Sequence, residues 1–184
     1  MQMLANNKSE RKNWSIIRKW VLGGIPVIIL LSSLMHDLYE WSGNNLIVGF
    51  IAPVNESIWE HLKMSFLPTL LWWTTGYFFF RRSLSISPAQ WFTPMVVSLY
   101  LCPLFITSFY YTYTGAFGIQ SLFLDILSLV LGVTAAQIIA LHLYRYARFN
   151  RIWLYLSMIL ILLMFVTFIV FTLSPPDIPL FKYS

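Results

Sequence analysis

The sequence has little charge. Only 10% of its 184 residues are Asp, Glu, Lys or Arg, against about 25% in an ordinary soluble domain. Apolar residues make up 58% of the chain, and they fall in long runs close to the ~20 residues that a helix needs to cross a bilayer. This composition excludes a soluble globular core and predicts one bundle of membrane helices with no second domain.

Cysteine is almost absent, because Cys102 is the single cysteine and lies in an apolar run. A disulfide framework and a cysteine-based metal site are therefore excluded. Histidine is also scarce, at three residues, and acids number seven. Any metal or acid–base chemistry must come from these few side chains.

The apolar runs predict an all-α polytopic bundle of about five transmembrane helices over residues 20–173. A basic tail at 1–19 precedes the bundle, an outer loop with a short helix lies at about 40–63, and an extended tail at 174–184 follows because its prolines oppose helix. The first run reads as a signal peptide or a retained anchor, and its length and lack of a small-residue cleavage site favour the anchor. The expected spans are 20–39, 62–80, 91–111, 119–144 and 152–172.

The Lys and Arg residues are distributed unevenly between the two sides of the expected spans. With a cytoplasmic N-terminus, ten of the twelve Lys and Arg residues lie in inner segments, and only Lys63 and Lys182 lie outside. The positive-inside rule therefore predicts that the N-terminus is cytoplasmic and the C-terminus is outside. Anionic lipid explains the basic inner rim, so we expect membrane lipid and no nucleic acid as a partner. Six of the seven acids fall in the outer half, where an acidic pocket would attract a metal ion or another cation.

Asp125 is the acid that most needs an explanation, because it lies about six residues inside its expected span. An ionised carboxylate at that depth costs a few kcal/mol unless it is paired, metal-bound or protonated. Helical spacing predicts a small, polar face directed into the bundle, made of Ser121, Asp125, Ser128, Gly132 and Ala136. The alternatives are a functional carboxylate or a protonated, purely structural one.

His36 and Glu40 are four residues apart at the outer end of the first span, so we expect them on one helix face. A histidine and a carboxylate at that spacing can bind a metal or can hydrogen-bond to fix the helix end. Asp37 is expected to point elsewhere.

Polar residues also gather at 53–63. Asn55 is a good helix N-cap, and acids suit the first turn of a helix. Glu56 and Glu60 are then expected on one helix face, with partial charge compensation from Lys63. Two carboxylates beside His61 indicate a shared cation or an acid–base pair. The order Glu-x-x-x-Glu-His is not the zinc-protease pattern H-E-x-x-H.

Four strings in these loops and tails resemble a family of small bacterial multi-pass membrane proteins of unknown function. They are LYEWSGNN at 38–45, PVNESIWEHLK at 53–63, YTYTG at 111–115 and PPDIPLF at 175–181. The Asn-Glu-Ser-x-Trp-Glu-His-Leu-Lys string is the most specific of them. The resemblance implies a bacterial plasma-membrane protein and implies no particular activity.

The leading hypothesis is an outward-facing membrane hydrolase or transferase that acts on lipid or an envelope component. Glu60 would be the general base, while His36, His61 and Asp125 would bind a divalent metal such as zinc or orient the substrate. The candidates are Glu56, Glu60 and Asp125 for catalysis, His36, Glu40 and His61 for metal binding, and Asn55 and Lys63 for other binding. The alternative is a non-enzymatic small transporter, cation or lipid binder, or assembly factor that uses the same acids.

Overall fold

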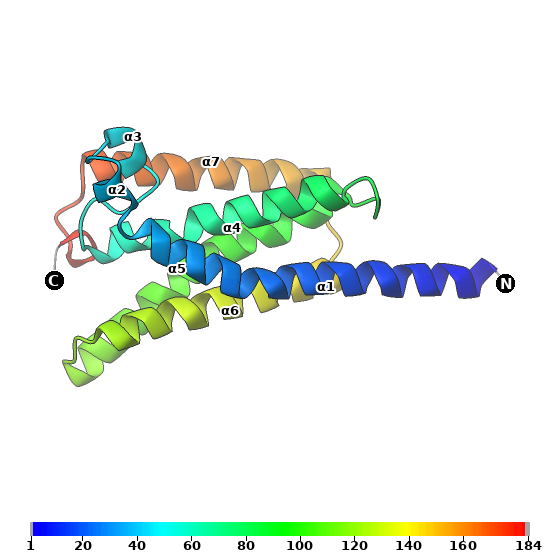
Figure 1. Ribbon diagram of the computed structural model, residues 1–184, viewed down its shortest axis with the longest axis horizontal. Helices are drawn as coiled ribbons and strands as arrows, with labels where there is room; N and C mark the ends of the chain where they lie inside the picture. Colours follow the sequence, from blue (N-terminus) through cyan, green and yellow to red (C-terminus); the bar gives the residue numbers. More distant parts are fainter. Residues whose placement is uncertain (1, 183–184) are drawn as a thin grey trace.

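The computed structural model describes the backbone of residues 2–182 and the side chains of residues 10–182. The described chain is helical, as the composition predicts (Figure 1). Its elements are α1 (Gln2–Met35), α2 (Leu38–Trp41), α3 (Leu46–Gly49), α4 (Ile58–Phe80), α5 (Pro88–Phe117), α6 (Leu122–Tyr146), α7 (Arg151–Leu173) and the short 3₁₀ helix η1 (Pro179–Phe181). Five of these helices lie side by side as a bundle, and α2 and α3 cap one end.

Four helices are long and apolar enough to cross a membrane. They are the part of α1 from Glu10 to Met35, and the whole of α5, α6 and α7. The helix expected at 62–80 is present as α4, and at about 1.5 Å per residue it is also long enough to cross the ~30 Å hydrocarbon core. Its composition is less apolar, so the count of five spans stays a prediction.

The position of α4 in the bundle explains its composition. Helices α4 and α7 have the same length, 23 residues, yet eleven residues of α4 are buried and only two of α7. Neighbouring helices shield α4, so it can carry polar side chains, whereas α7 presents an almost wholly apolar surface outward. Helix composition therefore follows contact with protein or with the surroundings, as expected when the surroundings are lipid.

Close contacts join α1 to α4 near the middle of the bundle. The indole rings of Trp20 and Trp72 stack with centroids 4.2 Å apart. A Cβ atom on Gly24 would overlap Trp72, and one on Gly76 would overlap Trp20. Glycine at these two positions is what lets each indole lie against the backbone of the opposite helix.

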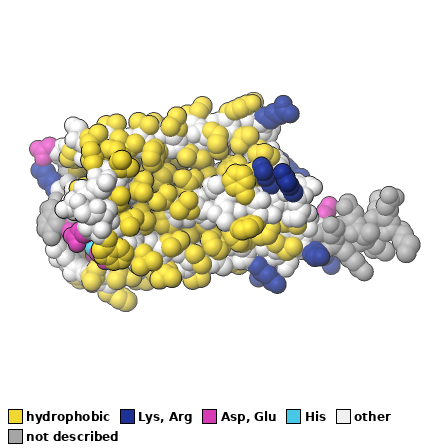
Figure 2. Space-filling view, turned by 45° about the horizontal axis from the view of Figure 1, so that its top comes forward, with side chains coloured by type: hydrophobic (Ala, Val, Ile, Leu, Met, Phe, Trp, Pro, Cys, Tyr) yellow, Lys and Arg dark blue, Asp and Glu magenta, His cyan; other side chains and the backbone are white. Residues whose placement is uncertain are grey.

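The two ends of the bundle carry opposite charge. Figure 2 shows most of the visible Lys and Arg side chains at one end. It shows Asp, Glu and His side chains at the other end together with one basic side chain, and one further acid beside the N-terminal helix. We call the first the basic end and the second the acidic end. The acidic end holds α2, α3, the start of α4, the α5–α6 turn and the last residues described (Figure 1).

Three expected boundaries are corrected at the acidic end. Helix α1 ends at Met35 rather than near residue 39. The span expected from residue 62 begins earlier, at Ile58 with Ser57 as its cap, and this helix takes the place of the separate short helix expected to start near Asn55. The C-terminal tail was expected to be fully extended, but Pro179–Phe181 forms a 3₁₀ turn. This turn forms because the ring of Phe181 packs 4.9 Å from that of Trp59, an apolar contact that the prolines do not prevent.

Candidate functional site

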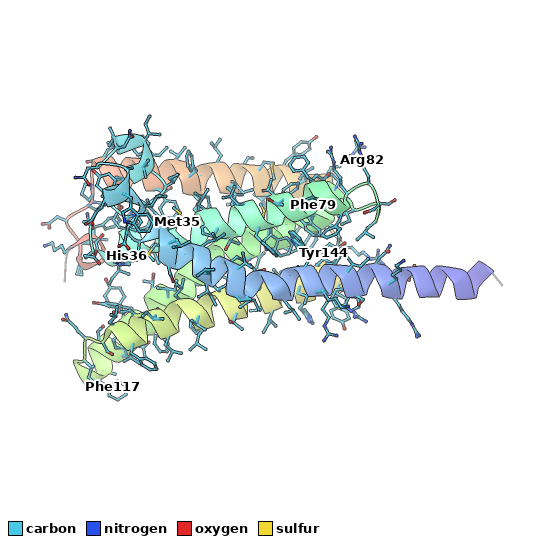
Figure 3. All side chains as sticks on the ribbon, in the orientation of Figure 1. Met35, His36, Phe79, Arg82, Phe117 and Tyr144 are labelled. Atoms are coloured by element: carbon cyan, nitrogen blue, oxygen red, sulfur yellow. The ribbon has the colours of Figure 1, made fainter. Side chains whose placement is uncertain are left out.

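His36 lies directly after the last residue of α1, where the chain bends away from the helix (Figure 3). Its Nδ1 atom is 2.8 Å from Oδ1 of Asp37, so Asp37 does not point away as the sequence predicted. A carboxylate only accepts hydrogen bonds, so Nδ1 carries the proton. The Nε2 atom of His36 is left to face Glu56.

The pKa of His36 is raised above its usual value of about 6.5. The hydrogen bond to Asp37 is the main cause, and the nearby Glu56 carboxylate adds to it, while partial burial acts in the opposite direction. Without another cation nearby, the protonated form of His36 is therefore favoured.

His61 is held in the first turn of α4. Its Nδ1 atom is 2.9 Å from the carbonyl oxygen of Ser57. A carbonyl is an acceptor only, so Nδ1 of this ring also carries the proton. The Ser57 side chain caps the helix by accepting from the Glu60 N–H at 3.4 Å, which fixes the turn that orients His61.

Glu56 lies two residues before α4, on a turn rather than on the helix. The Asn55 side chain accepts from the Ser57 N–H at 2.9 Å, and this local turn projects Glu56 toward the two histidines. Its Oε2 atom lies 3.2 Å from Nε2 of His61 and 3.6 Å from Nε2 of His36. One ligand atom from each of the three residues lies within 4.8 Å of the other two.

This arrangement requires a cation. With both Nδ1 atoms protonated, a neutral imidazole presents only a lone pair at Nε2, and the Glu56 carboxylate also presents only lone pairs. Acceptors that face each other at 3.2 and 3.6 Å repel unless a proton or a metal ion lies between them. Ligands on a tetrahedral zinc ion, at bond lengths of about 2.0–2.2 Å, lie roughly 3.3–3.5 Å apart. The observed spacings fit that value.

A cavity of about 660 Å³ lies beside the three residues. Its wall includes His36 after α1, Glu56 before α4, His61 on α4, Tyr113 on α5 and Asp125 on α6. Residues separated by almost ninety positions in the sequence therefore share one cavity at the acidic end. Of the six residues expected to form one site, four line this cavity (His36, Glu56, His61 and Asp125), and Glu40 and Glu60 do not.

Asp125 faces this cavity from the first turn of α6. The hydroxyl of Tyr113 donates to its Oδ1 at 2.5 Å, and Tyr113 itself is buried while Asp125 is exposed. Below Asp125, Ser128, Gly132 and Ala136 are buried, which confirms the inner part of the predicted small face, whereas Asp125 is exposed and Ser121 is only partly buried. The carboxylate is thus partnered on one side and open to the cavity on the other.

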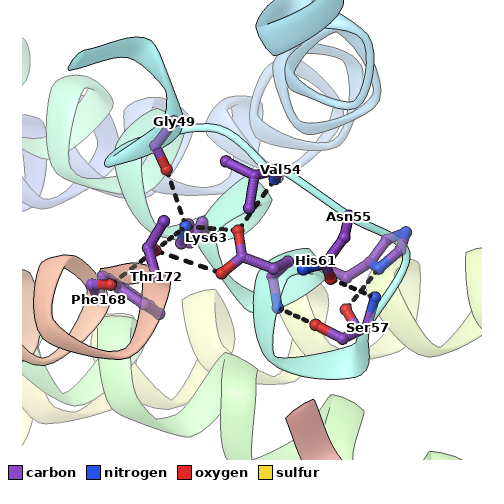
Figure 4. Close-up of polar contacts among 9 residues, drawn as sticks. Gly49, Val54, Asn55, Ser57, His61, Lys63, Phe168 and Thr172 are labelled. Atoms are coloured by element: carbon purple, nitrogen blue, oxygen red, sulfur yellow. Dashed lines mark hydrogen bonds and ion pairs between the residues drawn. The ribbon is translucent and has the colours of Figure 1, made fainter. Parts of the chain in front are cut away.

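Glu60 lies outside the cavity lining, in a buried ion pair with Lys63 (Figure 4). The Lys63 Nζ atom also donates to the Gly49 carbonyl at 2.9 Å and to the Thr172 hydroxyl. Glu60 accepts from the Val54 N–H at 3.0 Å. These bonds connect α4 to the end of α3 and to α7. The geometry therefore indicates that Glu60 and Lys63 stabilise the structure and do not face a substrate.

The expected pairings of Glu40 with His36 and of Glu60 with Glu56 do not form. Glu40 is exposed on α2, apart from the cavity, because α1 ends before His36. Glu56 and Glu60 share no helix face because only Glu60 belongs to α4. Asn55 shapes the turn and does not line the cavity.

The sequence left two interpretations of Tyr113 open, an interfacial tyrosine or a residue at the mouth of the site, and favoured the interfacial one. The contact of Tyr113 with Asp125 depends on the α5–α6 turn. The two residues are twelve positions apart in the sequence, and Gly118 in the left-handed conformation at the helix end is the signal for a tight hairpin. Such a hairpin places the end of one helix beside the start of the next.

Comparison with known proteins gives one match. A family model described as a family of unknown function (DUF6512) matches residues 9–184. No curated protein and no solved structure matches the chain. The matched range includes every residue of the cavity described above.

Proposed function

Because the chain belongs to the family of unknown function DUF6512, we propose a function from its own geometry: a membrane-embedded hydrolase that uses a divalent metal, best matched by zinc. The metal would be held by His36, Glu56 and His61. The observation that carries the proposal is the convergence of one ligand atom from each residue within 4.8 Å at the wall of a cavity.

The donor set supports zinc. Two histidines and one carboxylate form the ligand set of several catalytic zinc sites, in which a fourth position stays open for water or substrate. Each histidine also has its Nδ1 proton bound to an oxygen, of Asp37 or of Ser57. Such bonds fix the ring and direct Nε2 toward the metal, which is the usual environment of zinc-bound histidine.

Asp125 supplies the proton chemistry in this proposal. A bound zinc ion would lower the pKa of its water to about 7, and the Asp125 carboxylate on the same cavity would accept the proton that this water loses. Asp125 would return that proton to the leaving oxygen or nitrogen as the bond between the carbonyl carbon and the leaving group breaks and the water oxygen stays on the acyl product. The carboxylate would then be back in its starting state.

Charge suggests where this site faces. The cavity lies at the acidic end, and the arginines of the loops lie at the basic end (Figure 2). The positive-inside rule predicts that the basic end is cytoplasmic. The proposed site would then lie on the outer side of the bacterial plasma membrane.

Metal content tests the proposal directly. The protein, purified in mild detergent, is treated with chelator, incubated with zinc sulfate and desalted, and zinc is measured by inductively coupled plasma mass spectrometry. We expect about one zinc per chain for the wild type, as a three-ligand site requires. His61→Ala and Glu56→Gln should each weaken zinc binding by at least about 100-fold, because they remove ligands.

Two variants serve as matched controls. His142→Ala removes a histidine that lies on α6 beside Tyr146, and Glu40→Gln neutralises an acid outside the cavity. Both should bind zinc as the wild type does. If the folded wild type binds no zinc, or if all four variants bind it equally, the metal site is wrong. The same residues would then hold protons, and the alternative of a proton or cation binder would replace the hydrolase.

A further inference from the structure

The cavity opens toward the side of the bundle. Helices α1 and α6 cross near the middle of the molecule and diverge toward the acidic end (Figure 1). Cavity-lining residues on the two diverging edges are exposed: Ser33 on α1, and on α6 Leu122 at 75% and Ile126 at 53%. The cavity is therefore open between the two helices and not only at the end of the bundle.

This side opening lies within the apolar helices. Ser33 belongs to the last turn of α1 and Ile126 to the second turn of α6, and both helices are long and apolar enough to cross a membrane. The Ser33 hydroxyl is satisfied by the Ile29 carbonyl of its own helix, at 3.1 Å, so it presents no free donor to the gap. An amphiphile lying in the bilayer would meet this gap directly.

The cavity lining combines polar and apolar side chains. His36, Glu56 and Asp125 supply polar groups, and Leu122, Ile126 and Leu129 of α6 supply apolar contacts. A volume of about 660 Å³ falls within the ~300–1,000 Å³ of sites for small molecules. It can hold a lipid headgroup and the start of a chain, while the rest of the chain must remain outside, in the bilayer.

The charge of the cavity restricts the kind of lipid headgroup that it can bind. The carboxylates of Glu56 and Asp125 line the cavity, Asp37 is bonded to His36, and Lys63 is already bound to Glu60. Even with a bound dication, these carboxylates leave no surplus positive charge for a phosphate. A headgroup without net negative charge, with an acyl carbonyl at the reacting position, matches the cavity better.

We propose that the substrate is an acyl lipid without net negative charge, which enters sideways from the bilayer between α1 and α6. Its acyl carbonyl reaches the site of His36, Glu56 and His61, and its chain runs out past Leu122 and Ile126. This inference names the substrate class of the function proposed above and rests on it for the chemistry. The lipid position itself does not require the metal.

Photolabelling tests the lipid position. The protein is reconstituted in nanodiscs with phosphatidylcholine that carries a diazirine on the acyl chain close to the carbonyl, irradiated, and mapped by mass spectrometry. We expect labels concentrated on the facing segments around Ser33 and around residues 122–129. Labels spread evenly over the outward faces of α6 and α7 would overturn the side opening.

A pair of tryptophan variants sharpens the test. Ile126→Trp should fill the gap and reduce cavity labelling severalfold. Ile138→Trp is the matched control, because Ile138 is 51% exposed on the same helix but does not line the cavity. It should leave the labelling unchanged, and equal labelling in the two variants would contradict the proposal.

Two further measurements separate the possible failures. Diacylglycerol and phosphatidylglycerol probes of the same design test charge, and phosphatidylglycerol should label the cavity least; equal labelling would overturn the headgroup assignment. Zinc content is measured on every sample. If the cavity is labelled but the protein holds no zinc, the lipid site is retained and the metal site is overturned. If the protein holds zinc but the labels are spread uniformly, the metal site is retained and the lipid site is overturned.

Discussion

At the scale of single residues, two hydrogen bonds decide what the histidines can do. Asp37 and the Ser57 carbonyl each hold an Nδ1 proton, so in the neutral rings both Nε2 atoms face Glu56 with lone pairs. The repulsion between these acceptors is relieved by a proton on Nε2 of His36, which the raised pKa of His36 favours, or by a metal ion. The same two hydrogen bonds direct both Nε2 atoms toward the Glu56 carboxylate. Glu56, rather than Glu60, is therefore the third residue of the candidate metal site.

The acidity of His36 gives a first prediction, for the protein in metal-free buffer. The pKa of His36 is higher in the folded protein than in the unfolded chain. The resulting stabilisation of the fold is therefore fully present below the usual histidine pKa of ~6.5, and it is lost as the pH rises through the pKa of the folded state. Asp37→Asn removes the main cause. At pH 6 we expect this variant to melt at most about 2–4 °C below the wild type, because a partly exposed pair contributes up to ~1 kcal/mol.

Thermal unfolding midpoints at a series of pH values measure this difference, which should shrink toward pH 8.5. Asp177→Asn is the control, since Asp177 pairs with the exposed Lys182 and with no histidine. A difference for Asp37→Asn that is constant with pH would show that Asp37 does not act through the charge on His36.

Part of this site could be predicted from the sequence. Scarce His and acidic residues near expected span ends, such as His36, His61 and Asp125, were natural candidates, and the structure places them around one cavity. The choice between Glu56 and Glu60 could not be made. It depends on where α4 begins, and Asn55 and Ser57 are both acceptable caps by propensity.

At the scale of elements, the start of α4 is fastened by the buried pair of Lys63 and Glu60. Their side chains are 1% and 3% exposed, and Gly49, Val54 and Thr172 complete their hydrogen bonds. The pair joins three elements that meet next to the cavity. Its removal should therefore affect folding before it affects ligand binding.

Glu60→Gln tests that expectation. It leaves the Lys63 ammonium buried without its counter-charge, which typically costs about 3–5 kcal/mol. We expect a much lower unfolding temperature, with zinc bound per folded molecule unchanged. The double variant Glu60→Gln/Lys63→Met should recover part of the stability. Loss of zinc from correctly folded Glu60→Gln protein would instead return Glu60 to the site.

Element positions were predicted better than element ends. Each of the five long apolar runs is a helix, because length and hydropathy alone decide that outcome. The ends of α1 and α4 depend on local side-chain bonds, such as those of Asp37 and Ser57, whose partners are chosen by tertiary packing. The C-terminal turn was missed for the same reason, since Trp59 holds Phe181.

At the scale of the whole molecule, the separation of acidic and basic residues predicts the membrane topology. Helix α2, which carries Glu40, and the segment between α7 and η1, which carries Asp177, lie at the acidic end, and the loop after α4 lies at the basic end. If α4 crosses the membrane, these two sets of residues face opposite sides. The positive-inside rule predicts that the acidic end is outside.

Single cysteines test this arrangement. In intact cells a membrane-impermeant maleimide should label Glu40→Cys and Asp177→Cys, and should label Ser83→Cys only after the membrane is opened. The native Cys102 is 2% exposed and should stay unlabelled in every sample. Labelling of Glu40→Cys and Ser83→Cys from one side would mean that α4 does not cross, and the reverse pattern would invert the orientation.

The burial of α4 also has a consequence for synthesis. The ribosome delivers α4 before α5, which later covers much of it, and before α7, whose Thr172 binds Lys63. If α4 crosses the membrane, it first meets lipid with its Glu60 and Lys63 side chains incompletely covered. Charged residues resist insertion by roughly 2.5–3.5 kcal/mol each at the centre of the bilayer and by less near its edge. We therefore expect α4 to reach its final position only when α7 arrives, so that the cavity is assembled late.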